Sequence, residues 1–390
     1  MRIVLVHDYL KEYGGAERVL TVLHEMFPEA PIYTLFAISE SPCGKEFKNA
    51  KIVQSWFSFV PFCDKLISPF RFLIPLMWAQ FNFKDFDLVI SSASWAITKG
   101  FSNGTQRPAQ GAGRPAEICY CHTPPRYLYG YPTSVNWQKY WPVRMFALII
   151  NHFMRVYDFE AAQRVDWFIA NSQNVRKRIE KFYRRDSIVI YPPAALDAQH
   201  LRAGPPVDLP KVPKVEKGDY FLVVSRIVGA KGLQLAMEAA NKLNIKLKVV
   251  GKPAGYSNEY QKIKNMAGDN IEFLGFVSDS ELAKLYAGAR AFLALATDED
   301  FGMTPVEAML CGTPVIAYRG GGYLETVVDG KTGVFFSPAT VESLTGAIKN
   351  FEVLEKKGAF NTANIKKHAQ KFSKERFKKE ILRFVESKVK

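Results

Sequence analysis

Short apolar runs alternate with segments of helical period along most of the chain, and this alternation restricts the possible folds more than any other feature. Such a pattern is typical of parallel strands joined by helices. It occurs twice, on either side of a stretch rich in proline and polar residues, 192–218. The runs that predict strands are 2–9, 31–36, 86–92, 117–123, 166–172, 187–193, 220–225, 246–251, 270–277, 291–297, 313–318 and 332–336. The sequence therefore predicts an α/β protein with two doubly wound, Rossmann-like domains.

The chain length agrees with two domains, because 390 residues exceed what a single ordinary core contains. We expect an N-terminal domain over residues 1–195, a linker over 196–218 and a C-terminal domain over 219–371. Apolar residues at helical spacing predict a last helix within 372–390. This helix either crosses back to the first domain or lies alone on the surface.

Charge and composition exclude several classes of protein. The formal net charge is +14, but no zinc-finger or other nucleic-acid motif accompanies it, so nucleic acid is not expected as a partner. The five cysteines form no small-scaffold pattern, which favours a reducing compartment. The start of the chain lacks a signal-peptide pattern, and no uninterrupted apolar run is long enough for a transmembrane helix. These features predict a cytoplasmic protein.

The segment 297–322 carries the most specific functional signal. It reads TDEDFGMTPVEAMLCGTPVIAYRGGG, in which Glu299 and Glu307 are separated by seven residues. The pattern predicts a strand, a loop opened by Gly302 and a helix that contains Glu307. Fixed carboxylates at this offset can accept hydrogen bonds from two hydroxyl-bearing parts of one extended ligand. An ordinary solvated helix start would also place acidic residues here.

A second pattern of cations and glycines lies in VSRIVGAKGL, directly after a predicted strand. Arg226 and Lys231 stand at the carboxyl end of that strand, next to the start of a helix. Two permanent cations at such a position favour binding of a pyrophosphate group. An exposed basic turn is the alternative.

Candidate residues in the first half follow predicted strands as well. Gly14 and Gly15 precede an amphipathic helix, and His122 comes just before a Pro-Pro pair that ends its strand. Asp8 and Arg126 flank the same region and are further candidates for binding an acceptor. A glycine pair in a strand–helix turn and a structural histidine are the alternative interpretations.

Together these motifs resemble the retaining, metal-independent glycosyltransferases of family 4, which have the GT-B fold. The resemblance runs nearly end to end and is strongest for the mannosyltransferase-containing branch that assembles O-antigen, lipopolysaccharide and related surface polysaccharides. It implies two Rossmann-like domains that face an interdomain cleft. It also implies transfer of a hexose, mannose from GDP-mannose, to a hydroxyl of a lipid-linked oligosaccharide or polysaccharide acceptor.

The resemblance further implies a role for each matched residue. Arg226 and Lys231 would hold the diphosphate, Glu307 the nucleotide ribose and Glu299 the transferred sugar, with His122 beside the reaction centre. The donor site would also include Gly14, Gly15, Phe301, Gly302 and Met303, and the acceptor site Asp8 and Arg126. No metal ligand and no cofactor are expected, since the two cations would stabilise the leaving diphosphate.

Two stretches of the first domain suggest contact with a membrane. Residues 61–83 and 141–157 are dense in aromatic and aliphatic residues and are interrupted by cations. Such segments can lie at an anionic bilayer interface, although buried helices of a large domain would have a similar composition. We therefore expect peripheral attachment to the inner face of the cell membrane.

Two other functions fit parts of the sequence. A catalytically silent scaffold of the same fold could bind nucleotide sugar or membrane. A Rossmann-type oxidoreductase is disfavoured, because the first strand is not followed by GxGxxG.

Overall fold

The computed structural model describes residues 1–102, 114–133, 141–194, 216–227, 231–252 and 257–389. They form two compact units. The first unit comprises 1–131, 136–193 and 374–390, and the second comprises 132–135 and 194–373. Most of the expected linker 196–218 lies outside the described residues. The expected α/β architecture with two parallel sheets is confirmed.

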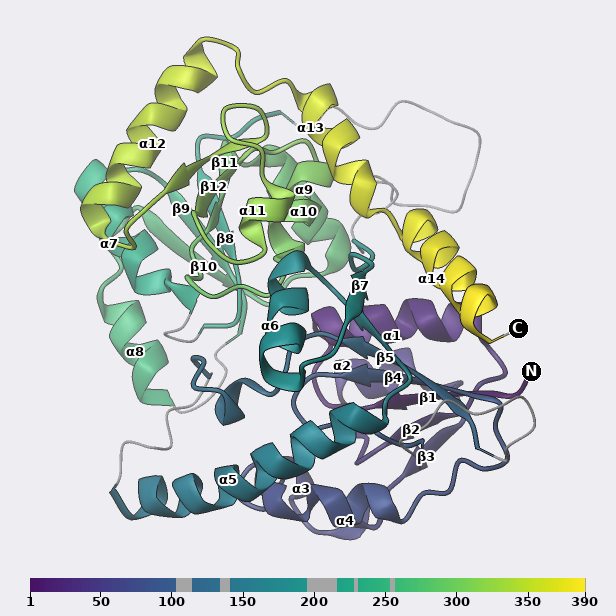
Figure 1. Ribbon diagram of the computed structural model, residues 1–390. Helices are drawn as coiled ribbons and strands as arrows, with labels where there is room; N and C mark the ends of the chain where they lie inside the picture. The colour runs from purple at the N-terminus through teal and green to yellow at the C-terminus, as the bar shows by residue number, and fades with distance from the viewer. Residues whose placement is uncertain (103–113, 134–140, 195–215, 228–230, 253–256, 390) are drawn as a thin grey trace. The chain divides into compact units, whose positions relative to one another are not determined.

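The first unit contains a parallel sheet with the strand order β3-β2-β1-β4-β5-β6-β7 (Figure 1). Its strands are β1 (Ile3–His7), β2 (Ile32–Thr34), β3 (Ile52–Gln54), β4 (Leu88–Ala93), β5 (Ala116–Cys121), β6 (Trp167–Ala170) and β7 (Ser187–Val189). The α-helices of this unit are α1 (Gly15–Met26), α2 (Pro42–Glu46), α3 (Cys63–Leu66), α4 (Ile74–Ala79), α5 (Trp141–Arg164), α6 (Gln173–Tyr183) and α14 (Lys374–Lys388).

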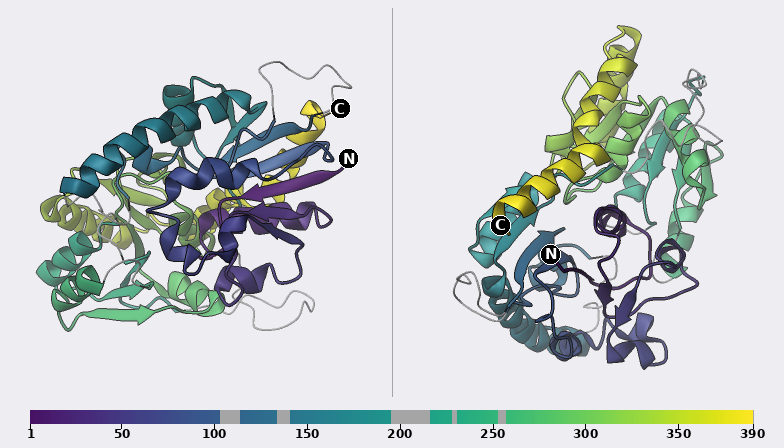
Figure 2. Two further views of the ribbon diagram at one scale, coloured as in Figure 1. Left: turned by 90° about the horizontal axis from the view of Figure 1, so that it is seen from below. Right: turned by 90° about the vertical axis from the view of Figure 1, so that its right-hand side faces the viewer.

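Alternate residues of each strand in this sheet enter different cores, as the period of a strand requires. Leu5 of β1 packs in the core that includes residues of α1 and α14, whereas Val4 and Val6 pack in the core that includes residues of α4 and α5. Helices therefore cover both faces of the sheet, and the long helix α5 is visible in both views of Figure 2.

The last helix, α14, belongs to the first unit although the rest of the chain's C-terminal part lies in the second. Its Phe377 is buried against the ring of Tyr120 on β5, with the ring centroids 5.8 Å apart. Lys374 and Lys378 form ion pairs of 2.6 and 2.9 Å with Glu25 of α1. These contacts attach the end of the chain to the helix that follows the first strand.

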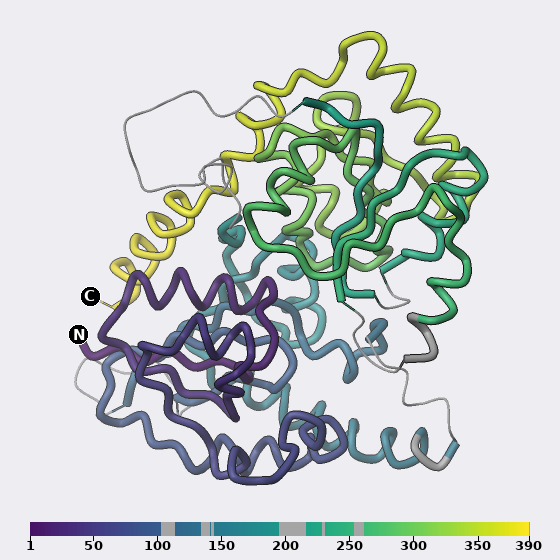
Figure 3. The backbone as a smooth tube through the Cα atoms, turned by 180° about the vertical axis from the view of Figure 1, so that it is seen from behind, coloured from purple at the N-terminus to yellow at the C-terminus, as the bar shows by residue number. Residues whose placement is uncertain are grey.

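The second unit contains a parallel sheet with the strand order β10-β9-β8-β11-β12-β13, whose chain path can be followed in Figure 3. Its strands are β8 (Phe221–Val224), β9 (Leu247–Val250), β10 (Ile271–Gly275), β11 (Ala291–Ala294), β12 (Val315–Tyr318) and β13 (Gly333–Phe336). The α-helices are α7 (Leu233–Leu243), α8 (Ser257–Asn265), α9 (Asp279–Gly288), α10 (Met303–Leu310), α11 (Tyr323–Thr326), α12 (Val341–Lys356) and α13 (Thr362–Ala369).

The strand order reverses once in each sheet, and this decides where ligands can bind. The reversal falls between β1 and β4 in the first unit and between β8 and β11 in the second. In open α/β sheets, ligands bind outside the carboxyl ends of the strands at such a reversal. Each unit therefore has one favoured site, and the candidate residues can be compared with it.

Candidate active site

Lys231 and Glu299 meet beyond the strand reversal of the second unit. Lys231 precedes α7, and Glu299 lies in the loop between β11 and α10. The Lys231 Nζ atom is 2.7 Å from Glu299 Oε2, and the two side chains are 30% and 19% exposed. The Tyr323 hydroxyl of α11 is 3.5 Å from the same carboxylate oxygen. The structure thus brings together two residues that are far apart in sequence, and both remain accessible to solvent.

The glycines 320–322 hold the backbone of Glu299 in place. The Gly322 amide donates to the Glu299 carbonyl over 2.9 Å. Gly321 has a φ angle of 56°, and a Cβ atom at this position would lie 2.4 Å from the same carbonyl oxygen. A side chain at 321 would therefore be strained and would displace the Glu299 backbone. This close approach gives a physical reason for the Gly-Gly-Gly sequence.

The loop between Glu299 and Glu307 is packed tightly. Gly302 precedes α10, and a Cβ atom there would lie 2.7 Å from the Tyr323 ring. Phe301 is buried, and its ring packs against that of Phe372 with the centroids 5.4 Å apart. Met303 is the first residue of α10 and is partly buried. Phe301, Gly302 and Met303 are the three residues of this loop that were expected to line a donor site. Of these, Phe301 is buried and supports the loop from the interior.

Glu307 has different surroundings from Glu299. It lies on α10 and is only 4% exposed. One of its carboxylate oxygens accepts a hydrogen bond of 3.2 Å from the Tyr286 hydroxyl of α9. This contact fixes the carboxylate at the edge of the core, whereas Glu299 reaches solvent.

Arg226 also lies beyond the strand reversal of the second unit. It follows β8 by two residues, and its side chain is exposed. Residues 228–230, which lie between the two cations, are outside the described residues. Both expected phosphate-binding cations therefore come from the segment that joins β8 to α7.

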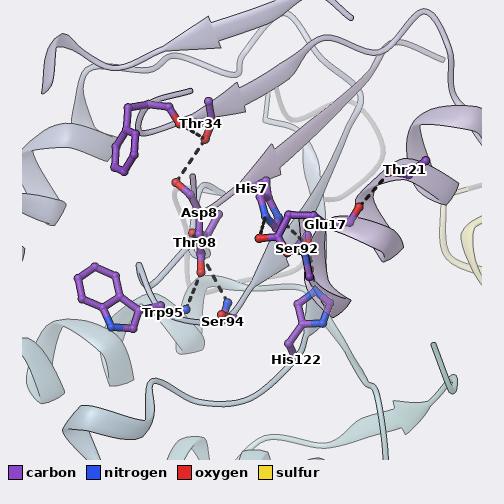
Figure 4. Close-up of polar contacts among 12 residues, drawn as sticks. His7, Asp8, Glu17, Thr21, Thr34, Ser92, Ser94, Trp95, Thr98 and His122 are labelled. Atoms are coloured by element: carbon purple, nitrogen blue, oxygen red, sulfur yellow. Dashed lines mark hydrogen bonds and ion pairs between the residues drawn. The ribbon is translucent and has the colours of Figure 1, made fainter. Parts of the chain in front are cut away.

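In the first unit, four side chains form a hydrogen-bonded row at the strand reversal (Figure 4). Glu17 Oε1 lies 3.5 Å from His7 Nε2, and His7 Nδ1 lies 3.1 Å from the Ser92 hydroxyl. The same hydroxyl lies 2.9 Å from His122 Nε2. These residues come from the start of α1, the end of β1, β4 and the residue after β5. His122 is thus held by a chain of polar groups that reaches α1.

Burial determines the charge of His122. Removal from solvent lowers the pKa of this imidazole from 6.5 to about 3; the nearby His7 lowers it further, and Asp8 partly opposes the change. A buried cation without a direct carboxylate partner is disfavoured. His122 is therefore neutral at physiological pH and can act as a hydrogen-bond donor or acceptor, but not as a cation.

Gly14 and Gly15 begin the helix on which Glu17 lies. Gly14 is the residue before α1, and its amide donates to Glu17 Oε2 over 2.9 Å. One Glu17 oxygen thus caps the helix while the other faces His7. A Cβ atom at Gly14 would lie 3.2 Å from the capping oxygen, so a glycine suits this turn.

Asp8 and Arg126 were expected to bind an acceptor. The Asp8 carboxylate is buried and accepts hydrogen bonds from the Trp95 amide at 2.5 Å and from the Thr98 hydroxyl, both in the loop after β4 (Figure 4). These bonds show a structural role for Asp8 in shaping that loop. Arg126 lies in a short 3₁₀ helix, Arg126–Leu128, and is partly exposed.

The sequence analysis did not single out His7, Ser92 or Glu17. A signal was present: His7 ends the first strand and Ser92 ends the run LVISS. Polar residues that end two adjacent parallel strands lie at the same sheet edge. The pairing of β1 with β4, in which His7 is opposite Ser92, supplies the adjacency that the sequence alone does not.

Residues 207–372 match the family of glycosyl transferases group 1. This segment covers the Lys231–Glu299 pair and both glutamates of the predicted motif. A D-inositol 3-phosphate glycosyltransferase of Mycobacteroides abscessus is 27% identical over 229 residues, which is 55% of this chain and 50% of that protein. The human alpha-1,3/1,6-mannosyltransferase ALG2 is 31% identical over 198 residues, which is 44% of this chain and 46% of that protein. This chain thus spans about half the length of these curated relatives.

Solved structures share the fold over the whole chain. HepE of Anabaena in complex with UDP has a TM-score of 0.70 at 20% identity, with 99% of this chain and 100% of that chain covered. Sucrose-phosphate synthase from Thermosynechococcus elongatus has a TM-score of 0.69 at 17% identity, with 99% of each chain covered. The fold class is therefore GT-B, as the sequence predicted.

Proposed function

We propose that this chain is a retaining glycosyltransferase that moves a hexose from a nucleotide sugar to a hydroxyl acceptor. The observation that carries the proposal is the contact between Lys231 and Glu299 beyond the strand reversal, inside the segment that matches glycosyl transferases group 1. A cation and a carboxylate side by side suit a ligand with a phosphate next to a polyhydroxylated ring. A nucleotide sugar has both groups at the bond to be broken.

The residues then have separate roles. Arg226 and Lys231 bind the diphosphate and stabilise the negative charge that develops as the glycosidic bond breaks. Glu299 accepts hydrogen bonds from the transferred sugar, and Glu307 holds the nucleotide ribose. Because two permanent cations face the leaving group, the reaction proceeds without a metal ion or other cofactor. The leaving phosphate itself removes the proton from the acceptor hydroxyl on the same face of the sugar.

Mannose from GDP-mannose is the donor we propose. Two similarities support this donor. A segment of 198 residues is similar to the mannosyltransferase ALG2, and the sequence motifs resemble those of mannosyltransferases of surface polysaccharide assembly. A uridine nucleotide is the competing choice, because HepE has been solved in complex with UDP and with UDP-glucose. The acceptor we propose is a lipid-linked oligosaccharide or polysaccharide.

A thermal-shift comparison tests the donor directly. GDP-mannose, UDP-glucose, GDP and UDP are each added with and without magnesium, since a ligand that binds the native state raises its melting temperature. Stabilisation by GDP-mannose and GDP, independent of magnesium, supports the proposal. Stabilisation only by uridine nucleotides would agree with a glycosyltransferase but would contradict GDP-mannose as the donor. A lack of response to every nucleotide sugar contradicts the function.

The silent scaffold of the same fold predicts a different result. It would bind GDP-mannose but would not consume it. Incubation of the protein with GDP-mannose and a membrane extract that contains lipid-linked glycans, followed by measurement of GDP release, separates the two. The matched control is Glu299→Ala, which removes the carboxylate while the Gly322 bond to the backbone carbonyl remains available.

We also propose that an apolar surface of the first unit attaches the protein to the inner face of the cell membrane. No helix among the described residues is long and apolar enough to cross a membrane. Helix α5 nevertheless presents a row of apolar side chains that are each 47–65% exposed: Met145, Phe146, Leu148, Ile149, Phe153 and Val156. Phe146 contacts the exposed ring of Phe72, with the centroids 6.5 Å apart, so the row continues onto the neighbouring segment.

Charge favours an anionic bilayer as the partner of this surface. Arg144 on α5 and Lys65 on α3 are exposed, and Lys65 Nζ lies 5.5 Å from the centre of the exposed Phe62 ring. Apolar side chains beside cations suit insertion at the headgroup level of an anionic leaflet. Residues 141–157 of α5 contain no acidic residue.

Flotation with liposomes tests this attachment. We expect the wild type to float with vesicles that contain anionic lipid, and the combined change Phe146→Ser, Ile149→Ser and Phe153→Ser to stay in the soluble fraction. Phe276→Ser is the control, because this exposed aromatic residue lies in the second unit. Flotation that depends on neither anionic lipid nor salt would contradict the proposal.

A further inference from the structure

A cavity of about 480 Å³ lies within the first unit. Its lining includes Pro75 and Leu76 of α4 and Tyr157 and Arg164 of α5, two helices that pack in the same core on one face of the sheet (Figure 1). A volume of this size is within the range of small-molecule binding sites. The proposed transfer reaction does not use this cavity.

The cavity lies at the amino end of the sheet. Two of its lining residues, Arg114 and Pro115, directly precede β5. The loop after β4 returns to the same edge, where the amides of Gly100 and Phe101 donate to the Glu117 carboxylate over 3.0 and 2.7 Å. The candidate residues of this unit follow the carboxyl ends of the strands instead. Because β5 has six residues, the two edges are about 20 Å apart, and a ligand of the cavity would bind away from the strand reversal.

Aromatic rings form one part of the cavity wall. The Phe101 ring packs against those of Trp78 and Phe83, with the centroids 5.3 and 5.2 Å apart. The Trp78 indole N–H donates to the Ala96 carbonyl over 2.9 Å, so the polar atom of this ring already has a partner. Leu76 extends the apolar wall outwards and is 61% exposed. This part of the wall therefore suits the carbon atoms of a ligand.

Cations form the other part of the wall. The four that line the cavity are Lys84, Lys99, Arg114 and Arg164. Lys99 and Arg114 each form an ion pair with an aspartate outside the lining. Among the described residues, no carboxylate forms an ion pair with Lys84 or Arg164, and none of the described lining residues is acidic. Arg164 uses its Nε atom to bond the Gly100 carbonyl over 3.0 Å, and its two Nη atoms carry further N–H donors. The cavity therefore has an excess of positive charge.

The cavity borders the apolar surface that we propose to enter the membrane. Val156, in the exposed row on α5, directly precedes Tyr157, which lines the cavity. On the other side, Leu76 lines the cavity from α4, and Phe72 just before this helix contacts Phe146 of the same row. A lipid of the adjoining leaflet can thus place its head in the cavity while its chains remain in the bilayer.

We propose that this cavity binds the phosphate-bearing head of an anionic membrane lipid. The phosphate contacts Arg164 and Lys84, and the glycerol and first acyl carbons pack against Trp78 and Leu76. A neutral sugar is disfavoured, because the lining offers no carboxylate to its hydroxyls. A free inorganic anion would leave the aromatic wall without a partner. For the source of the lipid, the proposal rests on the proposed attachment to the membrane.

Titration calorimetry with the full-length protein tests the ligand. The probes are a short-chain phosphatidylglycerol below its micelle concentration, the phosphatidylcholine of the same chain length, and inorganic phosphate. We expect the phosphatidylglycerol to bind at one molecule per protein, and the other two at least about tenfold more weakly, the equivalent of one charge-assisted contact. Inorganic phosphate that binds as tightly would overturn a lipid as the ligand. A lack of phosphatidylglycerol binding would overturn the site.

Two variants test the place of binding. Lys84→Glu reverses a charge at the exposed edge of the cavity and should weaken phosphatidylglycerol binding at least about tenfold. Ala79→Trp fills the cavity from an exposed position of α4 without changing the charge and should weaken binding as much. Lys48→Glu is the matched control, because it makes the same charge change at an exposed lysine of this unit outside the lining. Equal affinity in Lys84→Glu and Lys48→Glu, or in Ala79→Trp and the wild type, would overturn the assignment to this cavity.

The lipid site and the membrane attachment can fail separately. The combined change Phe146→Ser, Ile149→Ser and Phe153→Ser should abolish flotation with vesicles but leave binding of the short-chain lipid unchanged, because none of these residues lines the cavity. A loss of short-chain lipid binding in this variant would overturn a separate site. A wild type that binds the short-chain lipid but does not float would contradict the membrane attachment and leave the lipid site standing.

Discussion

Lys231 Nζ lies 2.7 Å from Glu299 Oε2, although 67 residues separate the two in the chain and they occupy different loops of the second unit. In the unliganded protein, the Lys231 ammonium and the Glu299 carboxylate form an ion pair with each other. The proposed nucleotide sugar would offer Lys231 a phosphate and Glu299 a hydroxyl, so both could exchange their partner when the donor binds. The pair is then a prearranged site and contributes little to stability, because both side chains are partly exposed.

The first prediction concerns this pair. Lys231→Ala and Glu299→Ala should each lower turnover of GDP-mannose by orders of magnitude, because each removes a group that faces the breaking bond. The free energy of unfolding should change by only about 0–1 kcal/mol, as is usual for exposed ion pairs. Steady-state kinetics and urea unfolding measure the two effects.

A matched control exists in the same unit. Arg319 and Asp329 form an exposed ion pair of 2.6 Å. Arg319→Ala should therefore change stability as little as Lys231→Ala does and should leave turnover unchanged. Near-wild-type turnover in Lys231→Ala or Glu299→Ala would mean that the site is assigned to the wrong residues.

The second prediction concerns the glycine beside Glu299. Gly321→Ala should destabilise the protein by more than about 1 kcal/mol, because an alanine is strained at a φ of 56° and its Cβ would meet the Glu299 carbonyl at 2.4 Å. Donor binding should weaken as well, since the Glu299 backbone must move. Calorimetry with GDP-mannose measures this loss.

Gly330→Ala separates backbone strain from the close approach. Gly330 has a φ of 70°, and a Cβ there would meet nothing within 4 Å. This variant should lose about 1 kcal/mol of stability from the left-handed backbone alone and bind the donor normally. Equal donor affinity in the two variants would contradict a role for Gly321 in holding Glu299.

Much of the fold could be predicted because its signals are local. All of the twelve strands expected from apolar runs are present, for example β1 at Ile3–His7 and β12 at Val315–Tyr318. Within the described part of the chain, the strand that was missed is β3, Ile52–Gln54. It is three residues long, lies at the edge of its sheet and is only partly buried, so it lacks the apolar run that identifies a central strand.

The candidate site was harder to predict because its contacts join distant segments. The spacing of Glu299 and Glu307 is local and was recognised, but nothing in the sequence shows that Glu307 is buried against Tyr286. Likewise, Asp8 is adjacent in sequence to His7, yet one bonds to the loop after β4 and the other to Ser92. Strand register, which the sequence does not specify, decides these partners.

The third prediction concerns a buried ion pair in the first unit. Lys99 and Asp158 form a direct ion pair, and their side chains are 2% and 0% exposed. The Tyr129 hydroxyl donates to Asp158 over 2.7 Å. Lys99→Met should destabilise the protein by about 3–5 kcal/mol, because the carboxylate remains buried without its cation. Adding Asp158→Asn should recover part of the loss, as urea unfolding would show.

The exposed pair Lys242–Glu342 provides the comparison. Its side chains are 55% and 75% exposed and its atoms are 3.6 Å apart. Lys242→Met should therefore leave the free energy of unfolding close to that of the wild type. If Lys99→Met changed this free energy as little, the buried pair would not be a stabilising element.

The last prediction concerns pH. Burial lowers the pKa of His122 from 6.5 to about 3 in the folded protein. Between these values the unfolded chain binds a proton at this residue and the folded chain does not, so stability is greatest above pH 6.5 and decreases as the pH falls towards 3. One proton corresponds to a slope of about 1.4 kcal/mol per pH unit.

Urea unfolding of the first unit between about pH 6.5 and 5 measures this dependence. The slope of stability against pH should be larger by this amount in the wild type than in His122→Asn, which cannot take up the proton. Other titrating groups are common to both proteins and cancel in the difference. Parallel curves for the two proteins would show that His122 takes up its proton in the folded protein over the same pH range as in the unfolded chain, which would contradict a pKa lowered by burial.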